Sequence, residues 1–189
     1  MIQPHLIVVA GPPAAGKTTL ARRAAAQLHL ALICKDTLKE SLFDCLGARD
    51  RTWSQRLGYA SIRALYALAR DILRSGASLI MESTFIHPDT PGELQTLLDE
   101  TGARLSVVYC YAAPEVLCAR FNARALTTRH PGHGDPSALT PREVAERGWS
   151  YRPDYPGTVI EVDTSDFAAV DVRAIAQRLA GFDKKTKAV

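Results

Sequence analysis

The chain has 189 residues, a length at which we expect one domain with a sizeable core. Hydrophobic residues make up 47% and charged residues 23%, which is ordinary globular usage and excludes a disordered or fibrous chain. The formal net charge is only +3, which argues against a nucleic-acid or membrane surface spread over the whole molecule.

Cysteine usage and hydropathy predict a cytoplasmic protein. Cys34, Cys45, Cys110 and Cys118 lie far apart and form no CxxC pair, which favours free thiols in a reducing compartment. The apolar run Leu6 to Ala10 is too short for a signal peptide, and no stretch is long enough to span a bilayer.

Short apolar runs alternate with longer helical patterns along the chain. This alternation is typical of successive βα units and predicts an α/β fold with a parallel sheet covered by helices on both faces. The expected strands are His5 to Ala10, Ala31 to Cys34, Ser78 to Met81, Leu105 to Tyr111 and Thr158 to Val162.

Four capping boxes, in which Ser or Thr is followed three residues later by Glu or Gln, predict helix starts. They begin at Thr37, Thr52, Thr90 and Thr140, and Pro91 and Pro141 occupy first helical positions in two of them.

The longest helix is expected from Trp53 to about Ser75, before Gly76, and a further helix should begin near Pro114. The apolar stripe of the longest helix is expected at Leu57, Ala60, Ala64, Leu65, Leu68, Ile72 and Leu73. Residues 127–139 are rich in glycine and proline and predict a mobile loop, and residues 183–189 a flexible tail after a single domain of residues 1–182.

A glycine-rich segment between the first strand and the first helix matches the phosphate-binding motif G-x-x-x-x-G-K-[ST]. Its glycines let backbone N–H groups face the phosphates, and the following helix presents the positive end of its dipole. Lys17 is expected to bridge the β and γ phosphates of ATP, and the Thr18 hydroxyl to ligate Mg²⁺. The expected nucleotide-binding residues of this segment are Gly11, Pro12, Pro13, Ala14, Ala15, Gly16, Lys17, Thr18 and Thr19.

Together with this motif, three further segments resemble the P-loop kinases of small hydroxyl substrates, an AAA-type ATP-binding group that includes chloramphenicol phosphotransferase, zeta toxin and the kinase domain of polynucleotide kinase. The segments are Lys35-Asp36-Thr37, Glu82-Ser83-Thr84 and Pro114 to His133. The resemblance implies a five-stranded parallel sheet of order 2-3-1-4-5, a substrate-binding helical insert over residues 36–76 and an arginine-bearing lid over residues 112–148.

Asp36 is the candidate for the base that accepts the proton of an acceptor hydroxyl. A helix N-cap is the alternative, but the Thr37–Glu40 capping box would leave Asp36 one residue outside the helix and free to point into the cleft. Asp36 could instead hold a magnesium-bound water.

Glu82 follows a strand at the position of a Walker-B acid, so it is a candidate magnesium ligand, through water, or a substrate contact. Alternatively, the Glu82 carboxylate could accept hydrogen bonds from backbone N–H groups in the Ser83-Thr84 turn. Thr84 is a weaker substrate candidate.

Arginines of the lid are expected to stabilise the transferring phosphoryl group. Arg120 and Arg124 are four residues apart and share one helix face, and Arg129 follows in the loop. We expect Arg124 to lie nearest the phosphoryl group, with Arg120 and Arg129 also contacting the nucleotide. A solvated helix face is the alternative.

Four other positions carry weaker signals. Asp163 resembles the turn that touches adenine in related kinases, although an N-cap explains it equally well, and Arg51 is a candidate substrate contact. His130 and His133 lack further ligands at metal-binding spacing, so we expect them near substrate or solvent.

These observations favour an ATP- and Mg²⁺-dependent kinase that acts on a hydroxyl of a small molecule. A nucleoside monophosphate kinase would need arginines facing the acceptor, and a polynucleotide 5′-hydroxyl kinase would need a basic groove. A nucleotide-dependent switch ATPase with a protein partner would need an extension for which the chain leaves little room. The acceptor, the choice between ATP and GTP and the oligomeric state stay open.

Overall fold

A computed structural model describes residues 3–127, 129–133, 138–147, 149 and 151–184. Five parallel strands form one sheet in the order β2-β3-β1-β4-β5, which confirms the expected order. The strands are β1 (His5–Ala10), β2 (Ala31–Cys34), β3 (Leu79–Glu82), β4 (Arg104–Tyr111) and β5 (Thr158–Asp163). β3 begins and ends one residue later than expected, so Glu82 is its last residue.

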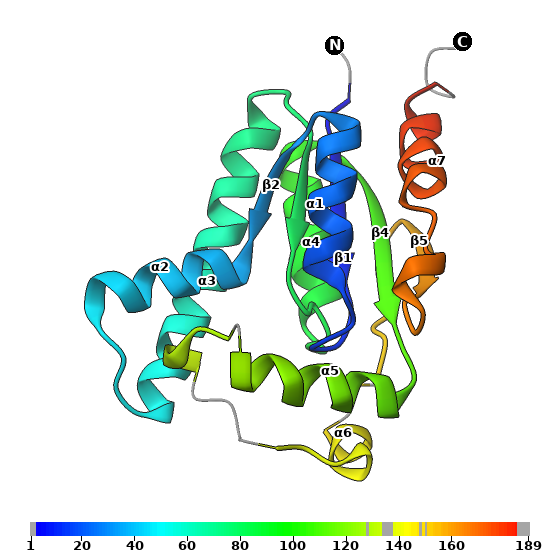
Figure 1. Ribbon diagram of the computed structural model, residues 1–189. Coiled ribbons are helices and arrows are strands. Elements are labelled where there is room, and N and C mark those ends of the chain that lie inside the picture. The colour runs from blue at the N-terminus through cyan, green and yellow to red at the C-terminus, as the bar shows by residue number, and fades with distance from the viewer. Residues whose placement is uncertain (1–2, 128, 134–137, 148, 150, 185–189) are drawn as a thin grey trace.

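Helices cover both faces of the sheet (Figure 1). Because side chains alternate along a strand, Ile7 and Val9 of β1 join the core under α1 (Lys17–Leu28) and α7 (Val172–Lys184). Leu6 and Val8 join the opposite core, under α3 (Arg51–Arg74) and α4 (Thr90–Thr101). The central strand β1 is therefore buried along its whole length.

Three of the four expected capping boxes are wrong, and only the box of Thr140 and Glu143, before α6 (Pro141–Glu146), is confirmed. β2 leads straight into α2 (Lys35–Leu46), so Thr37 already lies inside that helix. At α3 the Asp50 side chain caps instead, by accepting a hydrogen bond from the Trp53 backbone N–H. The N-cap of α4 is Asp89, so Thr90 is the first helical residue.

The remaining elements gather beyond the carboxyl ends of the strands (Figure 1). After β2 the chain forms α2 and α3; after β4 it forms α5 (Pro114–Thr127), which crosses below the sheet, then the short helix η1 (Pro131–His133) and α6. A second short helix, η2 (Phe167–Ala169), precedes α7. Residues 128 and 134–137 of the expected loop and 185–189 of the expected tail lie outside the described residues.

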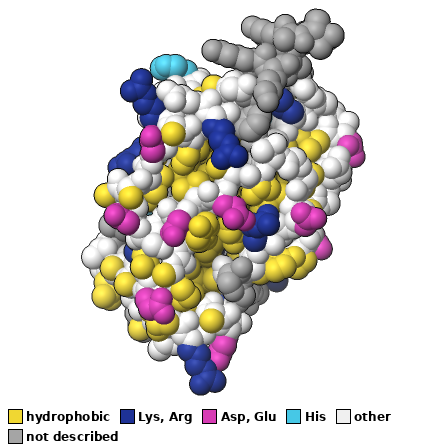
Figure 2. All heavy atoms as spheres, turned by 90° about the vertical axis from the view of Figure 1, so that its right-hand side faces the viewer, with side chains coloured by type: hydrophobic (Ala, Val, Ile, Leu, Met, Phe, Trp, Pro, Cys, Tyr) yellow, Lys and Arg dark blue, Asp and Glu magenta, His cyan; other side chains and the backbone are white. Residues whose placement is uncertain are grey.

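The surface on the side of α7 and β5 carries hydrophobic side chains in its middle, with acidic and basic side chains scattered among them (Figure 2). Among the described residues on this face, the basic side chains form no continuous band. None of the helices in the described part of the chain is long and apolar enough to cross a membrane. The four cysteines are free thiols, of which Cys45 alone is exposed.

The apolar stripe of α3 is narrower than expected. Leu57, Leu65 and Leu73 are buried, whereas Ala60, Ala64 and Leu68 face outward. Ser61 and Ala69 occupy the buried face instead, because small side chains let the helix approach the sheet.

Leu65→Ala should lower the free energy of unfolding by about 2–5 kcal/mol, because it removes a fully buried side chain and leaves a cavity between α3 and the sheet. Leu68→Ala, on the same helix but 43% exposed, should change it by less than about 0.5 kcal/mol. Urea unfolding measures both, and equal losses would contradict this packing.

Candidate active site

The glycine-rich loop, residues 11–16, joins β1 to α1 at the carboxyl edge of the sheet. Gly11 has φ +133°, and a Cβ there would lie 2.0 Å from the carbonyl oxygen of Cys110 on β4. Only glycine permits this approach. The buried Thr164 hydroxyl, just after β5, donates to the Ala15 carbonyl at 3.0 Å, so β4 and the turn after β5 both hold the loop.

Lys17, the first residue of α1, is only 7% exposed. Its ammonium donates to the Pro12 carbonyl at 2.6 Å, across the mouth of the loop. Burial lowers the pKa of Lys17, and the neighbouring Glu82 carboxylate opposes that shift. The lysine is therefore positioned against the loop that would hold the phosphates.

Thr18 and Glu82 bring two oxygen donors together, because the Thr18 hydroxyl donates to Glu82 Oε2 at 3.2 Å. Burial raises the pKa of Glu82, while the Lys17 ammonium lowers it. Within the described residues no cluster of three or more His, Cys, Asp or Glu side chains could hold a metal. The pair fits Mg²⁺, which prefers oxygen ligands and completes its shell with water and phosphate.

Asp36 lies in the first turn of α2 rather than outside the helix, contrary to our expectation, because α2 already begins at Lys35. Its carboxylate is 43% exposed and forms ion pairs with Lys35 at 3.2 Å and Arg129 at 3.0 Å. Burial alone would raise the pKa of Asp36, but the Lys35 and Arg129 cations outweigh it and hold the pKa well below its usual value. Asp36 is therefore ionised at neutral pH.

These side chains line one cavity of about 120 Å³, and a neighbouring cavity of about 190 Å³ shares its loop wall. The first is lined by Pro13, Ala14, Lys17, Thr18, Lys35, Asp36, Glu82, Ser83, Thr84, Arg124 and Arg129. The second is lined by Ala14, Gly16, Lys17, Thr18, Thr19, Arg120 and Arg124. The fold thus brings together the phosphate loop, both candidate acids and all three lid arginines. Lys35 is a residue to which the sequence analysis assigned no role, although it directly precedes Asp36.

Arg120 also holds the turn after β5, by donating to the carbonyls of Thr164 at 2.8 Å and Ser165 at 3.1 Å. Its Nη1 is buried and has no hydrogen-bond partner among the described residues, which leaves a donor available to a ligand.

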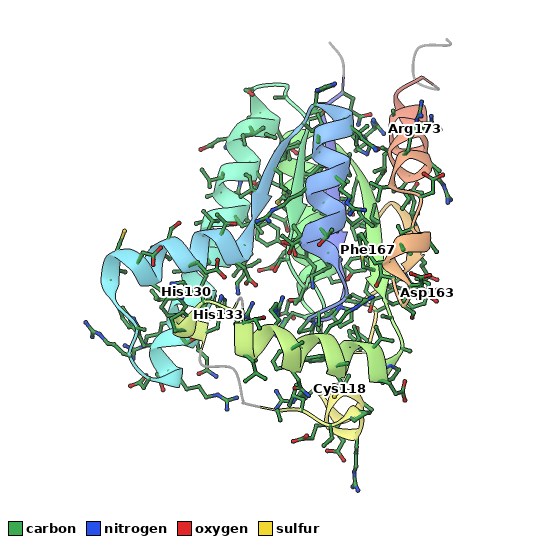
Figure 3. All side chains as sticks on the ribbon, viewed as in Figure 1. Cys118, His130, His133, Asp163, Phe167 and Arg173 are labelled. Atoms are coloured by element: carbon green, nitrogen blue, oxygen red, sulfur yellow. The ribbon has the colours of Figure 1, made fainter. Side chains whose placement is uncertain are left out.

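Asp163 and Arg51 are not part of either cavity. Hydrogen bonds from the Ser165 hydroxyl and from its backbone N–H, the latter at 2.8 Å, lower the pKa of Asp163; the N-cap of the following short helix is Asp166 rather than Asp163. Figure 3 shows Asp163 below Phe167, on the side of α7. Arg51, the first residue of α3, is exposed.

His130 and His133 line neither cavity at the phosphate loop; they pack on α2 (Figure 3). His130 pairs with Asp44 at 3.1 Å and His133 with Glu40 at 3.0 Å, and the Phe43 ring stacks on His130. Glu40 and Asp44 are four residues apart, so they share one face of α2. Two acids four residues apart on one helix, together with two histidines three residues apart, are the sequence pattern from which this contact could have been inferred.

Gly132, between the two histidines, makes this contact possible. A Cβ on Gly132 would lie 2.5 Å from the Phe43 ring, so a larger residue would force the segment away from α2.

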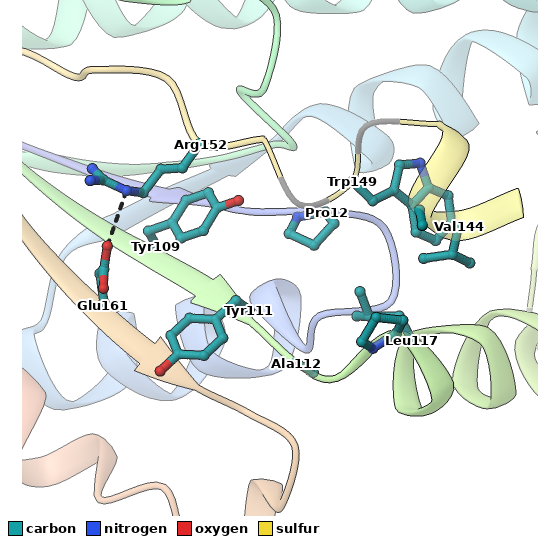
Figure 4. A pocket seen from close by; sticks show the side chains of 11 residues that line it. Pro12, Tyr109, Tyr111, Ala112, Leu117, Val144, Trp149, Arg152 and Glu161 are labelled. Carbon is teal, nitrogen blue, oxygen red and sulfur yellow. Dashed lines mark ion pairs between the residues drawn. The ribbon is translucent and has the colours of Figure 1, made fainter. Parts of the chain in front are cut away.

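A separate apolar cavity of about 330 Å³ lies on the other side of Pro12 (Figure 4). Tyr109, Leu117 and Trp149 contribute to its wall, and Arg152 and Glu161 form an ion pair there at 3.0 Å. It shares no lining residue with the two cavities at the phosphate loop.

The sheet order, the glycine loop on β1 and the acid at the end of the neighbouring strand β3 define the class as a P-loop kinase fold. The model of a family described as "AAA domain" matches residues 6–153, so the chain belongs to that family.

The comparisons with known proteins agree on this class. A crystal structure from Chloroflexus aurantiacus, named a "putative kinase", is 38% identical, with a TM-score of 0.87 over 95% of this chain and 98% of that one. Mycobacterium tuberculosis APS kinase CysC, in complex with AMPPNP and APS, is 13% identical, covers 96% and 98% of the two chains with a TM-score of 0.59, and shares the fold.

Among curated proteins, the uncharacterized protein Rv2004c of Mycobacterium tuberculosis is 31% identical over 150 residues, which cover 76% of this chain. The match spans 29% of the length of that relative.

The contact of His133 with α2 predicts a pH dependence of stability. Burial, followed by the Arg129 cation, lowers the pKa of His133, so the unfolded chain takes up this proton near pH 6.5 and the folded protein only at lower pH. Stability should be fully present above pH 6.5 and fall as the pH decreases below it. His133→Asn should reduce this slope in urea unfolding measured at a series of pH values.

The control is His29→Asn, at the exposed C-cap of α1, where φ is +53° and asparagine is tolerated. The slope should persist in this variant. An unchanged slope in His133→Asn would contradict the assignment.

Proposed function

We propose that the chain is a kinase that transfers the γ-phosphoryl group of ATP, with Mg²⁺, to a hydroxyl of a small-molecule acceptor. The observation that carries the proposal is the placement of an ionised carboxylate, Asp36, in the same cavity as Lys17 and Thr18. A site that only bound nucleotide would not need a carboxylate on the acceptor side of the phosphates.

In this proposal the glycine loop holds the ATP phosphates, and Lys17 contacts the β and γ groups. Thr18 and Glu82 hold Mg²⁺, Glu82 through water, and the ion would neutralise charge on the phosphate oxygens. Arg124 and Arg129 stabilise the transferring group, and Arg120 offers its free Nη1 to the nucleotide.

Asp36 accepts the proton of the acceptor hydroxyl as the oxygen–phosphorus bond forms and the bond to ADP breaks. Its low pKa keeps it ready as an acceptor but makes it a weak base while Arg129 and Lys35 pair with it. Because Arg129 lines the same cavity, a γ-phosphate there would compete with Asp36 for its guanidinium. Release of that ion pair would strengthen the base when ATP is present.

Residues 36–76 and 112–148 would then act as the acceptor-binding insert and the lid of one kinase domain, residues 1–182. The contact of His130 and His133 with α2 supports this arrangement, because it couples the two segments across the cavity. A phosphate-bearing acceptor is less favoured, because Arg51 does not line the cavity that contains Asp36. A screen of hydroxyl compounds with ATP and Mg²⁺, measured by ADP release, tests the proposal.

Lys17→Ala should lower phosphoryl transfer by at least about 10²-fold, because it removes the cation that meets the transferring charge. The fold should persist, but thermal unfolding should shift to a lower temperature, because Lys17 is buried and its loss leaves the buried Glu82 carboxylate without its neighbouring cation. Arg22→Ala, an exposed position on α1, should leave transfer unchanged. Equal turnover of Lys17→Ala and wild type would remove the basis of the proposal.

Asp36→Asn should leave ATP affinity nearly unchanged and lower the transfer rate by about 10²- to 10⁴-fold, the range for loss of a general base. Asp44→Asn, the same substitution in the same helix but at the His130 contact, should lower it far less. Retained transfer with an altered magnesium dependence would instead make Asp36 a metal-shell residue.

A further inference from the structure

A further cavity, of about 370 Å³, lies between α3 and the start of α4. It adjoins the cavity of about 120 Å³ at the phosphate loop, which Asp36 lines. The two cavities share Lys35, Ser83 and Thr84. A molecule in the larger cavity would therefore have one end beside Asp36. Its full wall is Lys35, Gly58, Tyr59, Ile62, Ser83, Thr84, Phe85, His87, Asp89, Thr90 and Glu93.

One side of this cavity is apolar. Ile62 and Tyr59 come from α3, and Phe85 comes from the segment after β3. Tyr59 is 68% exposed, so its ring is left uncovered by the protein at the cavity wall. The volume and the aromatic lining suit a small organic molecule with a ring.

Two acidic side chains line the cavity. Asp89 and Glu93 lie at the start of α4, and the Asp89 side chain makes no capping hydrogen bond to the helix. Glu93 is partly balanced by Arg63, 3.8 Å away, and Asp89 lies 3.5 Å from His87. Both pairs are on exposed side chains and are weak.

Cations in the described wall do not offset these acids. Lys35 is the one Lys or Arg that lines the cavity, and it is paired with Asp36 at the phosphate end. Burial, followed by the neighbouring Glu93 carboxylate, raises the pKa of Tyr66.

We propose that this cavity is the acceptor site and that it selects a hydroxyl compound with an apolar ring and a protonated amine. The inference rests on the proposed function. The ring would lie against Tyr59, the amine would pair with Asp89 and Glu93, and the hydroxyl would then be directed to Asp36. A carboxylated or phosphorylated acceptor, including a nucleoside monophosphate or a polynucleotide end, would place an anion beside two carboxylates.

Three ring alcohols that differ in charge test the selection: 4-(aminomethyl)benzyl alcohol, 4-methylbenzyl alcohol and 4-(hydroxymethyl)benzoate. Their binding is measured by calorimetry with Mg²⁺ and a non-hydrolysable ATP analogue, and their phosphorylation by ADP release with ATP. The amine should bind at least about 10-fold more tightly than the neutral alcohol, and the carboxylate more weakly than both.

Substitutions in the wall assign the preference to its residues. The double variant Asp89→Asn with Glu93→Gln should bring the amine to the affinity of the neutral alcohol. Asp99→Asn, on the same helix but outside the cavity, keeps the preference and is the matched control for charge. Tyr59→Ala should weaken all three ligands to a similar extent.

The two readouts separate this inference from the proposed function. Selective amine binding without ADP release would support the inference and count against the kinase activity on this class. ADP release with no charge preference would support the kinase and overturn the inference. Preference for the carboxylate, an unchanged double variant, or no binding of any of the three would also overturn it.

Discussion

The approach of Gly11 to the Cys110 carbonyl on β4 is the constraint on which the site depends. It seats the glycine loop directly on the neighbouring strand, and no side chain fits between them. Thr164 holds the far side of the loop through the Ala15 carbonyl. Between these contacts α1 must begin at Lys17, so Lys17 and Thr18 enter the helix side by side at the open edge of the sheet.

Charge balance at that edge follows from the seating of the loop. Lys17 and Glu82 are both buried, and each shifts the pKa of the other toward its charged form, against the effect of burial. Asp36 is balanced in the same way by Lys35 and Arg129. Buried charges are tolerated only when paired, so the cavity is already arranged around opposite charges. A nucleotide would add anionic oxygens to a site that has cations from the loop, α2 and the lid.

The helices that follow β2 and β4 meet over this edge, although 93 residues separate Glu40 from His133. Their contact depends on shape as well as charge, because Phe43 lies between the two histidines and against Gly132. This contact brings Arg129 to Asp36, so the same packing that joins α2 to the segment after α5 also sets the electrostatics of the candidate base.

The sequence by itself determined the α/β class and the position of the phosphate loop, and with the family resemblance it also anticipated the sheet order. Those features depend on local patterns, namely short apolar runs, helical periodicity and a glycine motif whose residue types follow from phosphate binding. All five strands were predicted to within one residue at each end for the same reason.

Only the tertiary structure decided how the helix starts, the histidines and the lid arginines are used. Thr37 has a capping sequence, but β2 continues into α2 and places it inside the helix. His130 and His133 bind α2, and Arg120 holds the turn after β5 as well as lining a cavity. Each outcome depends on partners dozens of residues away, and local sequence carries little information about which distant groups become neighbours. The cavity proposed for the acceptor exists for the same physical reason: its walls come from α3, the segment after β3 and the start of α4, and only their packing brings those walls together.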